Sequence, residues 1–462
     1  MKIKVVFVLW LLIAFLLALA LVEMAIIVGK IALNSYPFVD EFCYAVGKKN
    51  VGLWNLFFDT YLYWSGRFVS NFLFLFNPLN FDSLLWFRVS TFICFSIFIS
   101  IFFIPLKAID WHSRFEYFCA WLFFVTLCLF FTHEIYVAVL NFTNAISYNI
   151  SFAFCGMYFL AMSDRVKWSR RSRAFVIYAS LIAIAGTAEQ NVFLALAYLS
   201  FATVLSFIHS KRLRPHLDHW LFLLIIFLTI DMTSGNHLQF KERAFFTPLK
   251  AGESFVHMFE SMVGHFHLPV MSVGLISLVI GGILIGYHCQ FEKSILSVRK
   301  FLLVLSLSWF SHVLLVVLLV FAQGYMLAAR QFYPIFYSLG FFHFYCSLLL
   351  GSSFRGNWRG KSVVLPIGLL VIILINYLNP LWKKNRDFYY FEIIDQYALE
   401  MDNIHKNYFM KKIDRIPIPI QHVEHAFLYP HIPFMWEKAG ERFNACSGIY
   451  FGMPSVEFYI PQ

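Results

Sequence analysis

Charged side chains are scarce in this chain of 462 residues. Asp, Glu, Lys and Arg make up 13% of it, whereas hydrophobic residues make up 60%, and the mean hydropathy is +0.69. A soluble globular domain carries about 25% charged residues. The composition therefore excludes a soluble fold and predicts an all-α polytopic membrane protein.

Several motifs of common enzymes are also missing. The sequence has no Walker motif, no dinucleotide-binding glycine fingerprint and no context of a catalytic Ser or Cys. The histidines of "GHFH" (His265, His267) and "HVEH" (His422, His425) lack a third ligand at zinc-type spacing. We therefore expect no nucleotide and no cofactor, and no motif supports a divalent metal.

Long apolar runs recur along the chain. A helix needs about 20 apolar residues to cross the hydrocarbon of a bilayer. On this criterion we predict about eleven transmembrane helices. Their approximate ranges are 5–28, 84–106, 115–132, 145–162, 174–188, 192–208, 219–234, 269–286, 301–321, 332–350 and 362–378.

Lys and Arg fall mainly between alternate predicted helices. The dense runs "DRVKWSRRSR" and "KRLRPH" lie on one side, whereas 133–144 and 189–191 on the other side carry neither residue. The positive-inside rule then predicts a cytoplasmic N-terminus and an extracytoplasmic C-terminus. The net charge of +10 reflects this topology and attraction to anionic lipid, with no nucleic-acid partner expected.

Three predicted outer segments are long enough to form structure: 29–83, 235–268 and 379–462. In the first, "VGLWNLFFDTYLYW" and "RFVSNFLFLFNPLNF" predict helices in the membrane interface, with Trp64 at headgroup level. The tail is rich in proline and aromatic residues, which predicts a small extracytoplasmic domain. It would follow a transmembrane module spanning 1–378.

Only two of the eight cysteines, Cys43 and Cys446, fall in predicted outer segments. In an oxidising compartment they are a possible disulfide that joins the first outer loop to the tail. The alternative is two unpaired thiols.

Few ionisable side chains lie near the predicted outer face, and each is a candidate functional residue because a charge beside hydrocarbon is costly. They are Asp40, Glu41, Arg67, Glu134, Glu189, Lys241, Arg243 and Arg330. Adjacent acids in a low dielectric are suited to general-base work. Arginines can neutralise a departing phosphate.

Each candidate also has a structural explanation. Asp40 and Glu41 can cap the following helix, where acids favour the helix dipole. Arg67 and Arg330 can anchor the chain at lipid headgroups. Glu189 lies in a short turn between two apolar runs and can cap a helix there.

The order of five short motifs resembles a known family. "VDEFCYA", "YLYWSGRF", "NFTNAISYN", "AGTAEQN" and "AARQFYP" are similar to motifs of bacterial multi-spanning glycosyltransferases of the GT-C fold. Within that group the resemblance is to the phage-type O-antigen glucosyltransferases that convert serotype. It covers about the first 80 residues well and the rest as scattered motifs. Related sequences often show Asp-Asp where this chain has Asp40-Glu41, so either acid can be the base.

The resemblance implies an inverting hexosyltransferase of the bacterial inner membrane. It would move a sugar, with glucose expected, from a polyprenyl-phosphate donor to a surface polysaccharide such as the O-antigen of lipopolysaccharide. The resemblance assigns the catalytic role to Asp40 and Glu41. Around the donor phosphate we expect Arg67 and Arg330, supported by Glu189, Tyr333 and Trp64. Glu134, with Asn141, Asn144 and Tyr148, would line an acceptor groove or serve a structural role.

Three rival functions fit a polytopic chain. A flippase or transporter of lipid-linked sugars should show repeats and polar residues near mid-membrane, and the sequence has no internal repeat. A scaffold would need no acidic pair beside outer arginines. A polysaccharide polymerase or ligase would be built around a larger late outer loop than 235–268.

Overall fold

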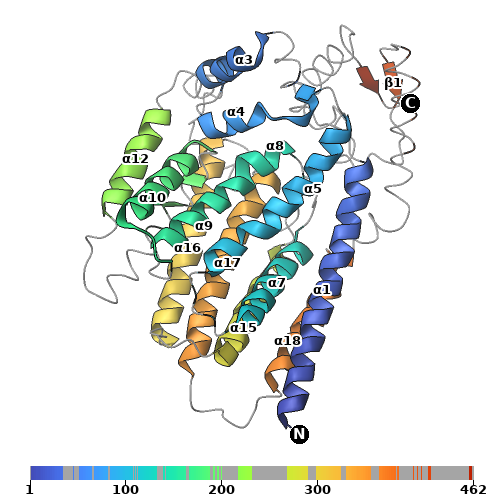
Figure 1. Cartoon of the computed structure of the whole chain (residues 1–462), viewed down its shortest axis with the longest axis vertical. Coiled ribbons are helices and arrows are strands. Elements are labelled where there is room, and N and C mark those ends of the chain that lie inside the picture. The colour runs from blue at the N-terminus through green and yellow to red at the C-terminus, as the bar shows by residue number, and fades with distance from the viewer. Residues whose placement is uncertain are drawn as a thin grey trace.

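The computed structural model of the chain is a bundle of helices with short helices lying across one end (Figure 1). It describes residues 2–34, 45, 51–64, 67–81, 84–107, 109, 111, 113–132, 139–140, 142–162, 166–187, 191–192, 195–196, 199, 217–231, 268–289, 298–323, 329–354, 364–380, 382–383, 399, 403, 407, 411, 415–417 and 457–459.

The longer helices form the body of the bundle. They are α1 (Lys2–Asn34), α5 (Leu84–Ile101), α7 (Arg114–Phe130), α9 (Ile150–Met162), α10 (Arg170–Ala185), α12 (Leu217–Asp231), α15 (Leu268–Cys289), α16 (Val298–Gln323), α17 (Ala329–Ser353) and α18 (Val364–Tyr377). Short helical pieces join them. These are α3 (Leu53–Asp59), α4 (Phe68–Phe74), α6 (Phe103–Leu106), α8 (Phe142–Asn144), the π-helical turns η1 (Thr60–Trp64) and η4 (Ala145–Asn149), and the 3-10 turn η2 (Pro78–Phe81).

Five of the described helical stretches are long and apolar enough to cross a membrane. They are Leu11–Leu33, Leu85–Leu106, Phe142–Met162, Ser272–Cys289 and Ile335–Ser353. The chain is thus a helical protein with several membrane-spanning candidates, as predicted. Helices occupy every predicted span except 192–208, of which the structure describes only residues 192, 195–196 and 199. Eleven crossings remain a prediction, because within the described residues only these five stretches have the length and hydropathy of a crossing.

The outer face of α1 is as apolar as its inner face. Ile27 and Val28 are fully buried against the bundle, whereas Phe15 is 59% exposed and Val22 is 54% exposed on the opposite side. A helix in water would carry polar residues on its exposed face. The exposed apolar face of α1 therefore suits contact with lipid.

The core centres on α7, which packs against α1, α15, α17 and α18. Its side chains are buried continuously from Cys119 to Phe130. Next to it, α15 and α17 approach closely because glycines and a serine line their contact, as small residues do in membrane helix pairs. A Cβ on Gly282 would lie 2.7 Å from the Cβ of Ser347 and 2.9 Å from the carbonyl oxygen of Phe344.

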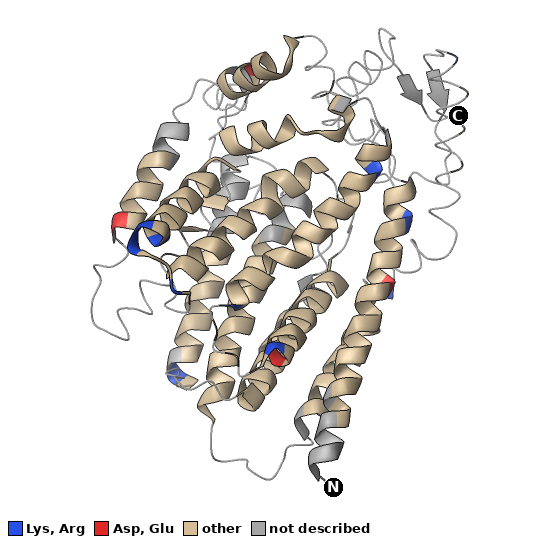
Figure 2. Ribbon diagram, in the orientation of Figure 1, with Lys and Arg blue, Asp and Glu red and all other residues tan. Residues whose placement is uncertain are grey.

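Charged residues lie mainly near the ends of the helices (Figure 2). Arg170, Arg171 and Arg173 lie in the first turn of α10, and Arg114 begins α7. The middle of the bundle is almost free of Asp, Glu, Lys and Arg among the described residues (Figure 2). This distribution matches helices whose central parts lie in hydrocarbon.

The predicted first outer loop forms helices within both predicted segments. In Figure 1, α3 and α4 lie across the end of the bundle opposite the start of α1. No residue of α3 is buried, and Trp54 and Phe58 are 60% and 54% exposed. An exposed aromatic helix at the end of an apolar bundle fits the predicted interfacial position.

The described chain is helical, as predicted, except for one short pair of strands. Strands β1 (Arg415–Pro417) and β2 (Glu457–Tyr459) pair in parallel, with Ile416 opposite Phe458. They lie at the same end as α3 (Figure 1). Strands of three residues are too short to show an alternating pattern in sequence, which is why they were not predicted. The domain boundary at 378–379 remains a prediction.

Candidate functional site

The structure describes only part of the predicted site. Outside the described residues lie Asp40, Glu41, Cys43, Glu134, Glu189 and Cys446. The backbone is described, but not the side chain, for Trp64 at the end of η1 and Arg330 in the first turn of α17. Backbone and side chain are both described for Arg67 and Tyr333.

Arg67 lies immediately before α4 and is half-buried. The first amides of a helix have no acceptor within the helix. Here the amides of Val69 and Ser70 donate to the carbonyl oxygen of Gly186, at 2.8 and 3.2 Å. Gly186 ends α10, so the start of α4, which follows "WSGRF", is docked on the start of "AGTAEQN". The sequence had predicted only that both lie on the same side.

The contact depends on residue 186 being a glycine, because there is no room there for a side chain. A Cβ at this position would lie 2.6 Å from side-chain atoms of both Phe68 and Val69. We expect Gly186→Val to push α4 off the turn, so that the amides of Val69 and Ser70 exchange with solvent faster. Hydrogen exchange measured by mass spectrometry would test this, with peptides of α17 as the internal control. Unchanged exchange in α4 would contradict the proposed docking.

Asn191 connects the same turn to a third segment. Its side-chain amide donates to the carbonyl oxygen of Ser147 at 3.0 Å and to the hydroxyl oxygen of Thr187 at 3.2 Å. Thr187 in turn donates to the carbonyl oxygen of Ile184 at 2.7 Å. Ser147 belongs to η4, a buried π-helical turn of the kind that is frequent at functional sites. The "NFTNAISYN" segment therefore joins the other two.

Tyr333 is fully buried in the second turn of α17. Its ring stacks on Tyr337 at 5.9 Å. The hydroxyl of Tyr337 lies 2.7 Å from that of Thr132, which follows the end of α7. These contacts fix the start of α17, and with it the backbone of Arg330, against the end of α7. The ring of Tyr333 thus packs on Tyr337 near the start of α17, and its predicted supporting role remains a prediction.

Neutral polar side chains concentrate where these segments meet. We call this group the amide cluster; its members are Ser70, Asn71, Asn144, Ser147, Asn149, Thr187 and Asn191, all buried. They come from α4, α8, η4 and the turn after α10, and α4 packs on η4. Burying polar groups is costly unless they are hydrogen-bonded. Their concentration at one end of an apolar bundle marks the cluster as a candidate binding site.

Ser70, Asn71 and Asn191 were not among the candidate functional residues predicted from the sequence. Ser70 and Asn71 were included only in an interfacial helix, and Asn191 only as a neighbour of Glu189. Burial of a neutral polar residue depends on tertiary packing, so composition and spacing carry little signal for it.

Two buried histidines were also missed. His312 of α16 lies with Nδ1 2.7 Å from the carbonyl oxygen of Ser308 and Nε2 3.1 Å from the hydroxyl of Ser338. His343 of α17 lies with Nδ1 2.7 Å from the carbonyl oxygen of Leu339. The ionisable candidates named from the sequence were Asp, Glu, Lys and Arg residues near the predicted outer face, so these two histidines were not among them.

Metal and disulfide chemistry find little support in the described part of the chain. No group of three or more His, Cys, Asp and Glu residues lies close enough there to hold a metal ion. All six described cysteines are buried, and no disulfide joins them to one another. The predicted Cys43–Cys446 pair lies outside the described residues.

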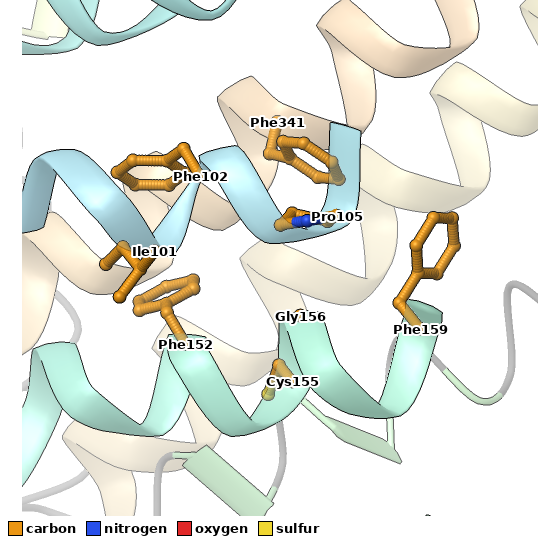
Figure 3. Close-up of a pocket in the computed structure, with 8 residues that line it drawn as sticks. All are labelled: Ile101, Phe102, Pro105, Phe152, Cys155, Gly156, Phe159 and Phe341. Carbon is orange, nitrogen blue, oxygen red and sulfur yellow. The ribbon is translucent and has the colours of Figure 1, made fainter. Parts of the chain in front are cut away.

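An apolar crevice opens between α5, α6, α9 and α17 (Figure 3). Its lining residues are Ile101, Phe102, Pro105, Phe152, Cys155, Gly156, Phe159 and Phe341. None of them carries a charge, and aromatic rings make up much of the wall. The crevice is therefore apolar, and it is small, with room for no more than a water-sized group.

The described residues thus give a neutral polar site at one end of the bundle, with Arg67 at its edge, and a separate apolar crevice between α5, α6, α9 and α17. No protein-family model, curated protein or solved structure matches the chain.

Proposed function

We propose that the chain is a GT-C-type glycosyltransferase that moves a hexose from a polyprenyl-phosphate donor to a surface polysaccharide such as O-antigen. One observation carries the proposal: hydrogen bonds join Val69, which follows "WSGRF", to Gly186 of "AGTAEQN", and Asn191 of that motif to Ser147 of "NFTNAISYN". The family resemblance rests on these three motifs. These segments are far apart in sequence. Their meeting at one polar end of the bundle is what a shared active site requires.

The proposed reaction is a single displacement at the anomeric carbon of the donor sugar. Asp40 or Glu41 takes the proton from the attacking acceptor hydroxyl as the new glycosidic bond forms. The bond from the anomeric carbon to the phosphate oxygen breaks, and the lipid phosphate leaves with that electron pair. Arg67 and Arg330 stabilise its charge, while Glu189 and Trp64 support the site.

The proposed topology follows from the chemistry. Eleven crossings with a cytoplasmic N-terminus put the first loop and the tail 379–462 outside the bacterial inner membrane, where surface polysaccharide is modified. The end that carries α4 and β1 (Figure 1) is then the outer end. The isoprenoid tail of the donor would lie between helices that open to lipid.

Mass spectrometry of surface polysaccharide from cells with and without the gene tests the function. The proposal expects a mass difference of one hexose per repeating unit. A change in chain length alone would instead identify a polymerase or ligase. Identical polysaccharides would contradict the proposal.

Replacing Arg67 with Ala should weaken donor binding. A hydrogen bond to a charged group contributes about 1.5–3 kcal/mol, so we expect the KM for the donor to rise by about 10- to 100-fold. Arg67→Lys should restore part of this loss because it keeps the charge but loses the planar fork. Arg114→Ala is the control, since Arg114 is exposed at the start of α7. An unchanged KM in Arg67→Ala would remove Arg67 from the site.

One observation favours a second candidate, a flippase or transporter of lipid-linked sugars. His312 and His343 are buried in α16 and α17, at 3% and 2% exposure, and such residues often mark transport paths. The purified protein separates the two functions. Transfer of sugar in detergent, without a sealed membrane, supports the enzyme, whereas movement of lipid-linked sugar only across vesicles supports the flippase.

A further inference from the structure

We propose that Asn191 and Ser70 bind hydroxyl groups of the donor sugar and select a neutral hexose. This inference rests on the proposed function and adds to it the residues that recognise the sugar. Two observations carry it: the fixed orientation of a buried amide, and a buried hydroxyl beside the same turn.

The amide of Asn191 is held in one orientation. Its nitrogen carries two hydrogens, and it makes two hydrogen bonds, to the carbonyl oxygen of Ser147 and to the hydroxyl of Thr187. A flipped amide would place oxygen against the carbonyl oxygen of Ser147. The side-chain oxygen is therefore fixed as an acceptor. It is buried and has no hydrogen-bond partner in the described part of the chain.

Ser70 supplies a second group beside the same turn. Its side chain is fully buried, and among the described residues its hydroxyl has no partner. Its amide donates to Gly186, next to Thr187, which contacts Asn191. A buried polar atom without a partner in the described chain is a candidate contact for a bound molecule. An acceptor and a hydroxyl together fit a sugar hydroxyl, which both donates and accepts.

The absence of charge in the amide cluster favours a neutral sugar over an acidic one. Every member of the amide cluster is neutral. The fixed oxygen of Asn191 would repel the carboxylate of a uronic acid, because both are acceptors. Arg67 lies three residues before Ser70, immediately before the start of α4. A phosphate at Arg67 would therefore hold its attached sugar near Ser70.

Binding to the full-length protein in lipid nanodiscs tests the inference. The probes are radiolabelled polyprenyl-phosphate glucose and polyprenyl phosphate without sugar. Wild type should bind the glucosylated lipid more tightly. Asn191→Ala and Ser70→Ala should each lower that affinity by about 10- to 100-fold, the range expected when a buried polar group loses its partner. Affinity for polyprenyl phosphate should stay within about twofold of wild type.

Two matched controls have the same local chemistry elsewhere in the bundle. Asn376 is fully buried, donates to Ser277 and Ile372, and has a side-chain oxygen without a partner in the described chain. Ser308 is buried with its hydroxyl likewise unpartnered among described residues. Asn376→Ala and Ser308→Ala should bind both lipids as wild type does. An equal loss of glucosylated-lipid affinity in the controls would overturn the inference.

The remaining outcomes separate this inference from the proposed function. If wild type binds both lipids equally, sugar recognition is wrong and the lipid-phosphate site stands. Binding to neither lipid would overturn the proposed function itself. If the variants fail to fold, wild type is tested with donor lipids that each lack one sugar hydroxyl. At least one should bind about tenfold or more weakly, and equal binding of all would overturn the inference.

Discussion

Asp40→Asn and Glu41→Gln are expected to show the largest functional effects. General acid-base catalysis contributes about 10²- to 10⁴-fold to a rate, so replacing the base should lower kcat for sugar transfer by that factor. Both changes remove one charge and keep the size of the side chain. Protein abundance and donor affinity should therefore remain close to wild type. Sugar transfer to purified acceptor, measured with labelled donor, is the readout.

The two single variants identify the base. The acid whose replacement causes the full loss of kcat is the general base. The other acid, whose replacement has a smaller effect, shifts the pKa of that base. Asp59→Asn is the matched control, because Asp59 is an exposed carboxylate at the end of α3 in the same predicted loop. Wild-type transfer by both Asp40→Asn and Glu41→Gln would contradict general-base catalysis by the pair. A scaffold would tolerate all three changes.

The sequence predicted the helices well because bilayer thickness sets their length. A run of about 20 apolar residues has few alternatives to a membrane helix, and the predicted runs at 84–106 and 269–286 became α5 with α6, and α15. Short runs carry less signal. The predicted span 219–234 coincides with α12, yet at 15 residues that helix is below the usual length for crossing a bilayer.

The site was predictable only in part, for a physical reason. Charge near hydrocarbon is costly wherever it occurs, so Arg67 stood out in the sequence. Ser70 and Asn191 become candidate binding residues only because packing buries them. The hydrogen bonds from Ser70 to Gly186 and from Asn191 to Ser147 join segments that are far apart in sequence. No local pattern encodes such contacts.

The helix pair α15–α17 carries the prediction with the largest effect on stability, Gly286→Ala. A Cβ on Gly286 would collide with the backbone carbonyl of Leu348, and one on Gly351 with the backbone carbonyl of Ile283. A backbone clash cannot be relieved by rotating a side chain. The helices must therefore separate along their contact, and close packing is the main attraction between helices in lipid.

The expected loss is about 1–3 kcal/mol of unfolding free energy, the usual range for overpacking, and more for Gly286→Leu. Gly29→Ala is the matched control, since an added Cβ there would lie 3.7 Å from Phe92, an ordinary contact. In that helix the same change should be neutral or stabilising by up to about 1 kcal/mol, because Ala favours helix over Gly. Thermal unfolding of both variants in one detergent gives the comparison. Equal unfolding temperatures would show that α15 and α17 do not pack this closely.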